Sequence, residues 1–205
     1  MSTARLFHKL TDEHGRTYGG TQWGPGVTHS GTGEGDLCGP GWVHVYDDPI
    51  LAIFLNPIHA NFQNPRMWEG TASGKILGDH GLKFGVETFT AIREIPCHKV
   101  TPEQQVRFGI LCALEIYTEP GFVAWADGWL SSADRSAEVA RAAWSTARAA
   151  WSTAVATRAA MVATRAAMAA AEAARTAGAT EAAEMVAREV NLDLKALAKK
   201  AMETT

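Results

Sequence analysis

The chain has 205 residues and a formal net charge of −3, and 46% of its residues are hydrophobic. Residues 1–130 carry 9 Lys/Arg and 14 Asp/Glu, a net of −5, whereas residues 131–205 carry 10 and 8, a net of +2. Neither part has the concentrated basic composition typical of nucleic-acid binding, and no apolar run approaches the roughly 20 residues of a membrane-spanning helix. We therefore expect neither nucleic acid nor membrane as a partner.

The cysteines indicate the redox compartment. Cys38, Cys97 and Cys112 are an odd number and form no CxxC pair. This usage argues against a disulfide framework and favours a reducing environment. The expected location is the cytoplasm.

The first 130 residues contain all 8 prolines and most of the aromatic residues, a composition typical of a compact, loop-rich domain. The pattern predicts a small α+β domain with mostly antiparallel strands and short helices. Its expected elements are, in chain order, a hairpin over residues 4–23 turning at 12–15, a glycine-rich loop over 24–41, a strand over 42–46, a short helix from 48 that ends before Pro57, and strands over 66–76 and 86–95.

Two helices are expected to complete this domain. Thr101-Pro102-Glu103-Gln104 has the pattern of a capping box with proline at the first helical position. The helix that follows should end at Glu119-Pro120-Gly121. A second, short helix then places Phe122, Trp125 and Trp129 on one side.

Residues 131–205 form a second expected region, rich in alanine. Between residues 137 and 190, 24 of 54 residues are Ala, and two seven-residue words, RAAWSTA and VATRAAM, are each written twice from Arg141 to Met168. A strict seven-residue period is the period of a left-handed coiled coil. The sequence therefore predicts a long, coiled-coil-like helical tail from Ser131 to about Val190, with a last helix after Asp193.

A solitary alanine helix of this length is marginal in water, because packing supplies most of the stability of a helix. The tail must therefore pack against a copy of itself, against its own domain or against a partner. Duplication in the gene that only supplies length is the simpler explanation of the repeats and stays open. Self-association into a homo-oligomer would use the small-residue seam and the two indoles, namely Ala143, Trp144, Ala147, Ala150, Trp151, Ala154, Met161 and Met168.

The segment Gly33–Pro49 holds the densest set of chemically capable side chains. Cys38 and His44 are able to form a thiolate–imidazole pair, but no third orienting group is marked. A zinc site would need Cys38, His44, His59 and Cys97, which lack the short ligand spacing of zinc sites. The glycines match neither nucleotide-binding fingerprint. We expect no metal and no cofactor, and we assign no catalytic residue.

A ligand cleft is the other possibility for this region. His44 lies between Trp42 and Tyr46, which share its side of the predicted strand, so it belongs either to the core or to the floor of a cleft. Two arginines are available to neutralise an anion. The candidate ligand-binding residues are Cys38, Trp42, His44, His59, Arg66 and Arg93.

The run from Thr21 to Gly70, with GLKFG at 81–85 and IREIP at 92–96, resembles an uncharacterised family of tailed-phage and prophage proteins. The shared motif is Leu-Cys-x-x-Gly-aromatic-x-His, represented by Leu37, Cys38, Gly41, Trp42 and His44. Members often append an alanine-rich repeat. The resemblance covers about residues 5–130. It implies a phage origin, an accessory role and the host cytoplasm, and it carries over no catalytic residue.

Three functional hypotheses follow. The first is a non-enzymatic phage accessory protein, oligomerised by its tail, that binds a small polar ligand or a host protein; sequestration of a nucleotide immune signal is its most concrete form. The alternative is a structural or assembly protein of the phage. The second alternative is a transferase or hydrolase that uses His44, Cys38 and an acidic residue such as Asp36 or Glu69.

Overall fold

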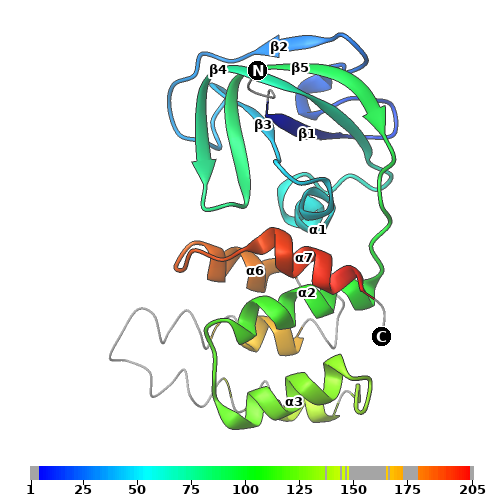
Figure 1. Ribbon diagram of the computed structural model, residues 1–205, viewed down its shortest axis with the longest axis vertical. Helices are drawn as coiled ribbons and strands as arrows, with labels where there is room; N and C mark the ends of the chain where they lie inside the picture. Colours follow the sequence, from blue (N-terminus) through cyan, green and yellow to red (C-terminus); the bar gives the residue numbers. More distant parts are fainter. Residues whose placement is uncertain are drawn as a thin grey trace. The chain divides into compact units, whose positions relative to one another are not determined.

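The computed structural model describes residues 5–136, 138–143, 145, 147, 165, 167–172 and 180–203. The chain divides into two compact units, Met1–Lys99 and Val100–Thr205 (Figure 1). We call them the sheet unit and the helical unit. The sequence placed the boundary after residue 130, whereas the two helices between residues 102 and 130 fall in the helical unit.

The sheet unit is built on one antiparallel sheet. Its strand order is β1-β4-β5-β2, and β3 also pairs with β5. The long hairpin of β4 and β5 is therefore the centre of the sheet, and the three shorter strands pair with it. The strands are β1 (Leu6–Thr11), β2 (Thr28–Ser30), β3 (Val43–Val45), β4 (Arg66–Asp79) and β5 (Lys83–Ile95).

A tight turn sets the register of the β4–β5 hairpin. His80 and Gly81 have φ values of 48° and 77°, and the Leu82 N–H donates to the Asp79 carbonyl at 2.7 Å. Two successive positive φ values are the geometry of a type I′ turn, whose twist matches that of antiparallel strands. The first pair of the ladder is Asp79 with Lys83, which leaves residues 80–82 in the connection.

The predicted hairpin over residues 4–23 is wrong. β1 pairs with β4, and the segment that was expected to pair with it makes only an isolated bridge between Arg16 and Gln22. Between these two residues, Gly19 and Gly20 both have a φ of 78°, in a short 3-10 turn over Tyr18–Gly20. Positive φ at two successive glycines interrupts the extended backbone that a strand needs.

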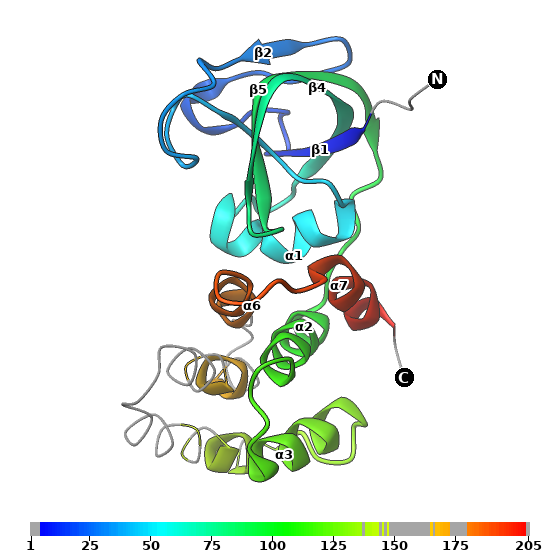
Figure 2. The ribbon, with the colours of Figure 1, turned by 60° about the vertical axis from the view of Figure 1, so that its left-hand side comes forward.

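Helix α1 (Pro49–His59) begins as the sequence predicted. The Asp48 carboxylate accepts the backbone N–H groups of Ile50 and Leu51, each at 2.9 Å. The expected end before Pro57 is wrong, because the helix continues through this proline to His59. Helix α1 contacts β1 (Figure 2).

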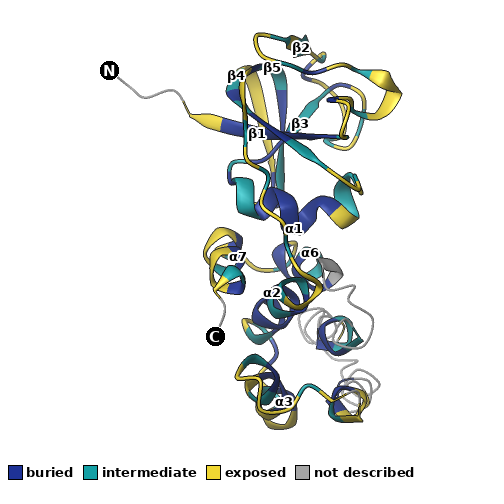
Figure 3. Ribbon diagram, turned by 90° about the vertical axis from the view of Figure 1, so that its right-hand side faces the viewer, coloured by how far each residue is buried: buried dark blue, intermediate teal, exposed yellow. Residues whose placement is uncertain are grey.

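The interior of the sheet unit contains large side chains. Aromatic and β-branched residues from four strands pack together with Trp23, and buried residues are dark blue in Figure 3. This cluster consists of Phe7, Trp23, Val45, Trp68, Val86, Phe89 and Ala91.

The helical unit is organised around α2 (Pro102–Leu114). Helices α6 (Thr180–Ala187) and α7 (Leu194–Met202) pack beside α2, as does α3 (Pro120–Leu130) (Figure 2). The predicted capping box is confirmed, because Thr101 Oγ1 accepts from the Gln104 N–H at 3.1 Å while Gln104 Oε1 accepts from the Thr101 N–H at 2.9 Å.

The fold class expected for the C-terminal region, a long coiled-coil-like tail, is wrong. Helix α3 ends at Leu130, and Ser132 adopts a left-handed φ of 63°, so no helix starts at Ser131. Arg135 then folds back over the Trp129 ring, with its guanidinium carbon 4.5 Å from the ring centroid, and pairs with Glu103 at 2.7 Å. The described helices of this unit are short and pack on one another.

The residues assigned to oligomerisation divide into two groups. Ala143 and Ala147 are buried in the hydrophobic cluster of the helical unit, and Met168 packs against it. These three side chains therefore contact the chain's own core. Packing of the tail against its own chain was one of the three alternatives given from the sequence. The other five, Trp144, Ala150, Trp151, Ala154 and Met161, lie outside the described residues. Within the described part of the chain, no helix is both long and apolar enough to span a membrane.

Candidate functional site

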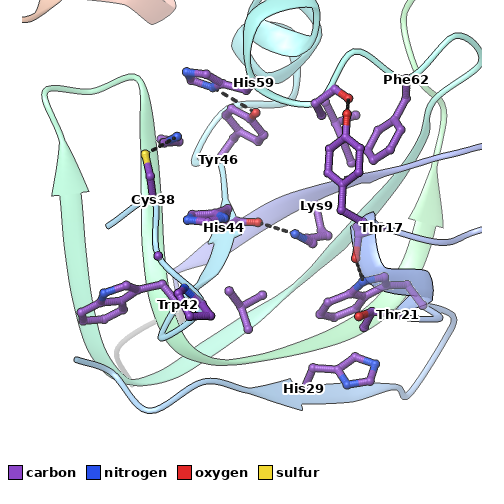
Figure 4. Close-up of a pocket in the computed structure, with 18 of the residues that line it drawn as sticks. Lys9, Thr17, Thr21, His29, Cys38, Trp42, His44, Tyr46, His59 and Phe62 are labelled. Carbon is purple, nitrogen blue, oxygen red and sulfur yellow. Dashed lines mark hydrogen bonds between the residues drawn. The ribbon is translucent and has the colours of Figure 1, made fainter. Parts of the chain in front are cut away.

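The sheet unit contains a cavity of about 560 Å³ (Figure 4). Strands β1, β2 and β3 each contribute side chains to its wall, as do the 17–23 loop, the 38–42 loop and the end of α1. Of the residues predicted to bind a ligand, four line the cavity: Cys38, Trp42, His44 and His59.

Lys9 is the most unusual residue of this cavity. It belongs to β1, is only 9% exposed, and lies with its Nζ 5.4 Å from the centroid of the Trp23 ring. The Nζ donates a hydrogen bond of 2.8 Å to the backbone carbonyl of His44. Burial lowers the pKa of Lys9 from 10.5 to about 8, because removal from water disfavours the ammonium form.

His44 is held by a backbone partner on the Gly-rich loop. Its Nε2 bonds to the carbonyl oxygen of Leu37. A carbonyl only accepts, so Nε2 carries the proton. Burial is the largest influence and lowers the pKa of His44, and Lys9 and Lys83 lower it further, while the bond to Leu37 raises it. The ring is therefore neutral near pH 7, with its lone pair on Nδ1.

Tyr46 and His59 form a stacked pair in the cavity wall. Their ring centroids are 6.0 Å apart, and the Tyr46 hydroxyl is 3.2 Å from His59 Nδ1. Burial raises the pKa of Tyr46, so its hydroxyl stays protonated. His59, which the sequence analysis selected, thus contacts the residue that directly follows β3.

Aromatic rings line the opposite side of the cavity. Trp23 donates from Nε1 to Thr17 Oγ1 at 3.1 Å and meets the His29 ring edge-on at 4.6 Å. At the rim, Tyr18 is 73% exposed and lies 5.6 Å from Phe62, centroid to centroid. An exposed tyrosine beside a second ring offers a flat apolar surface to a planar ligand.

Cys38 lies at the rim rather than in a catalytic pair. It is exposed, and its Sγ is 3.3 Å from Lys83 Nζ. Cys38 Sγ contacts Lys83 and His44 Nε2 bonds to Leu37, so these two contacts do not form the Cys38–His44 pair considered from the sequence. Within the described residues, no three His, Cys, Asp or Glu side chains gather in a way that could hold a metal ion.

The two predicted arginines lie outside the cavity lining. Arg66 binds the carboxylate of Glu94 with Nε and Nη2, at 2.8 and 2.5 Å. Arg93 binds Glu69, with Nε at 2.8 Å and Nη2 at 2.7 Å from the same oxygen. Both are cross-strand ion pairs between β4 and β5, so their charges are neutralised by the chain itself.

The prediction from the sequence did not include the two lysines that line the cavity, Lys9 and Lys83. The signal was available at Lys9, a lysine in the middle of the strand LFHKLT, where every residue from Phe7 to Thr11 is buried. Further missed lining residues have no local signal, because they approach the cavity through loops and pairing partners far along the chain. They include Thr17, Tyr18, Trp23, His29, Phe62 and Lys83.

No family model, curated protein or solved structure matches the chain. The resemblance to the phage family therefore stays a prediction from the motif around Cys38 and His44. Any assignment of function has to come from the cavity.

Proposed function

We propose that the sheet unit binds a small anionic ligand that carries a planar ring, and that the ligand belongs to the nucleotide class. The observation that carries this proposal is the charge of the cavity lining. The lining includes two lysines and three histidines, and none of the described lining residues is Asp or Glu. A concave site with cations and without carboxylates favours a negatively charged ligand.

The aromatic residues supply the second part of the proposal. Tyr18, Trp23, Trp42, Tyr46 and Phe62 all line the cavity. Flat rings bind planar rings by stacking, and stacking of a nucleobase on an aromatic side chain contributes about 1–3 kcal/mol. A volume of about 560 Å³ falls in the range of small-ligand pockets and accommodates a mononucleotide.

The rim cation, Lys83, is half-buried and therefore more accessible to an incoming phosphate than the buried Lys9. Lys83 contacts Cys38 Sγ, a weak acceptor, so a phosphate oxygen would compete readily for this ammonium. In the accessory role expected from the phage resemblance, such a site would capture a nucleotide-like signal of the host.

The test is isothermal titration calorimetry of the full chain with AMP, with adenosine and with inorganic phosphate. We expect AMP to bind at least about ten-fold more tightly than either part, because it uses both the cations and the rings. Lys83→Gln should weaken AMP binding by about five-fold. The matched control is Lys75→Gln, since the Lys75 side chain is 61% exposed and lies outside the cavity lining.

Two outcomes would overturn the proposal. The first is that adenosine binds as tightly as AMP, which would mean that the cations do not recognise an anion. The second is that Lys75→Gln weakens AMP as much as Lys83→Gln, which would mean that general surface charge causes the binding. Cyclic AMP and a cyclic dinucleotide, run alongside, show which nucleotide shape the site prefers.

A further inference from the structure

We propose that Lys9 is a nucleophilic amine that captures the carbonyl carbon of an aldehyde-bearing anion held in this cavity, forming a reversible imine. This inference rests on the proposed anion site and goes beyond it, because it assigns covalent chemistry to one residue. The ligand class is a phosphate ester with an aldehyde, such as an open-chain sugar phosphate.

The surroundings of Lys9 place its amine for such an attack. Lys9 lines the cavity, and its Nζ makes one hydrogen bond in the described structure, to the carbonyl of His44 (Figure 4). That bond uses one N–H of the amine. When Lys9 is neutral, its lone pair and its second N–H remain available to a ligand. The neighbouring Trp23 ring and the buried Leu10 keep this part of the wall apolar.

The charge around Lys9 differs from that around an ordinary buried lysine. Buried ammonium groups are generally paired with a carboxylate. The described lining of this cavity supplies no Asp or Glu, and desolvation is the one influence on the pKa of Lys9, which is lowered to about 8. At pH 7.5 about a quarter of such amines are neutral, against about one in a thousand at the ordinary lysine pKa. Lysines desolvated in this way are the ones that form Schiff bases.

The chemistry balances without an oxidant or a cofactor. The lone pair of the neutral Nζ forms a bond to the carbonyl carbon, and the oxygen takes up a proton to give a carbinolamine. The nitrogen then forms the C=N bond as the hydroxyl, protonated by solvent, leaves as water. One amine and one aldehyde give one imine and one water. Lys83 at the rim is the cation available to hold the phosphate while the aldehyde reaches Lys9.

The first experiment uses the full chain with pyridoxal 5′-phosphate, a planar, anionic aldehyde, followed by borohydride reduction and peptide mapping. We expect one equivalent of adduct, on Lys9, at pH 7.5. Pyridoxine 5′-phosphate, which has an alcohol in place of the aldehyde, should bind by calorimetry without forming an adduct. Lys9→Arg keeps the positive charge and should still bind the alcohol, but should lose the adduct at least ten-fold; Lys75→Arg is the matched control.

A second measurement needs no variant. The labelling rate of the native chain should rise with pH to a half-maximum near pH 8 at Lys9, whereas exposed lysines should continue to gain reactivity toward pH 10. Adduct formation on exposed lysines with Lys9 unmodified would overturn the inference. If pyridoxine 5′-phosphate or AMP binds in that case, the anion site stands and only the imine fails. If neither compound binds, the proposed function fails as well.

Discussion

The sheet unit and the helical unit fill their interiors with side chains of very different size. The cluster of the sheet unit is dominated by rings, with Phe7, Trp68 and Phe89 nearly inaccessible to solvent. The described cluster of the helical unit combines the aromatic residues of α3 with nine alanines, seven of which lie between residues 140 and 182. Large side chains carried by different strands hold the backbones of the sheet unit apart, whereas alanines let helix backbones approach closely.

This difference explains where a site can form. The cavity is bordered by loops and strands of the sheet unit that bring lysine, histidine and aromatic residues together. A small apolar side chain such as alanine offers neither charge nor a hydrogen bond. We therefore expect ligand binding in the sheet unit, whereas the helical unit depends on close packing. Substitutions in the two units should reduce stability for different reasons.

The largest effect is expected for Gly31→Ala in the sheet unit. A Cβ at this position would overlap the carbonyl oxygen of Gly41, where the two ends of the segment 31–41 between β2 and β3 pass each other. The loop must then move, and it carries Cys38 to the cavity rim. We expect the sheet unit to lose about 3 kcal/mol of unfolding free energy and AMP affinity to fall at least ten-fold.

Hydrogen exchange, measured separately for amides of β5 and of α2, checks this expectation. The control is Gly24→Ala, whose Cβ would meet only Val27 Cγ2 at 3.8 Å. Equal protection of β5 in the two variants would show that the loop crossing does not constrain the sheet unit. Loss of protection in α2 would show that the two units do not respond separately.

In the helical unit, the corresponding substitution is Ala198→Leu on α7. Ala198 is fully buried, whereas Ala196 on the same helix is exposed. Overpacking at Ala198 should cost about 2 kcal/mol, and Ala196→Leu should change stability by less than about 0.5 kcal/mol. Exchange of the α2 amides measures both. Equal effects would mean that close packing at α7 is not what stabilises this unit.

The comparison of the two units also shows which features could be predicted from the sequence. Local signals were reliable where one short segment decides the outcome, as at the Asp48 cap of α1 and the Thr101 capping box of α2. The antiparallel sheet and its central strands followed from alternation. The hairpin over residues 4–23 was wrong because the partner of β1 is β4, whose residues lie about sixty positions further along the chain. Propensity does not encode such pairing.

The prediction of a long coiled-coil-like tail was wrong for a related reason. A seven-residue period requires that one face of a helix be covered, but it does not say by what. Ser132 and the return of Arg135 onto Trp129 end the preceding helix, and Ala143 and Ala147 are covered by the chain's own cluster. The candidate site was half predictable: the motif residues Cys38, Trp42 and His44 line the cavity, but Lys9 reaches it through long-range pairing.

Lys9→Met separates stability from function in the sheet unit. The folded pKa of Lys9, about 8, lies below the unfolded value of 10.5, so the buried ammonium destabilises the fold below about pH 8. Methionine keeps the apolar stem and removes the charge. At pH 7 we expect the free energy of unfolding to rise by about 2 kcal/mol, allowing for the lost bond to His44, while AMP affinity falls by about ten-fold.

The stability gain should shrink between about pH 8 and 10.5, where the native lysine is already neutral in the folded state. Lys75→Met, at an exposed position, is the control and should leave both stability and affinity unchanged. A Lys9→Met variant that is less stable than the native chain at pH 7 would contradict the desolvation argument.

The smallest effect is the pH dependence of AMP binding in the native chain. Other titratable groups line the cavity around Lys9, namely Tyr18, His29, Cys38, His44, Tyr46, His59 and Lys83. Burial lowers the pKa of His44 and raises that of Tyr46, so neither gains or loses charge between pH 7 and 9. AMP is a dianion over this range. Affinity should therefore fall by about five-fold as Lys9 loses its proton near pH 8.

The variant Lys9→Arg isolates this residue, because arginine keeps its charge at every pH of the titration. Its AMP affinity should change by less than about two-fold between pH 7 and 9. An equal fall in the native chain and in Lys9→Arg would assign the titration to another group of the lining. A flat profile in the native chain would mean that the anion is recognised at the rim alone, and that the floor of the cavity holds the uncharged part of the ligand.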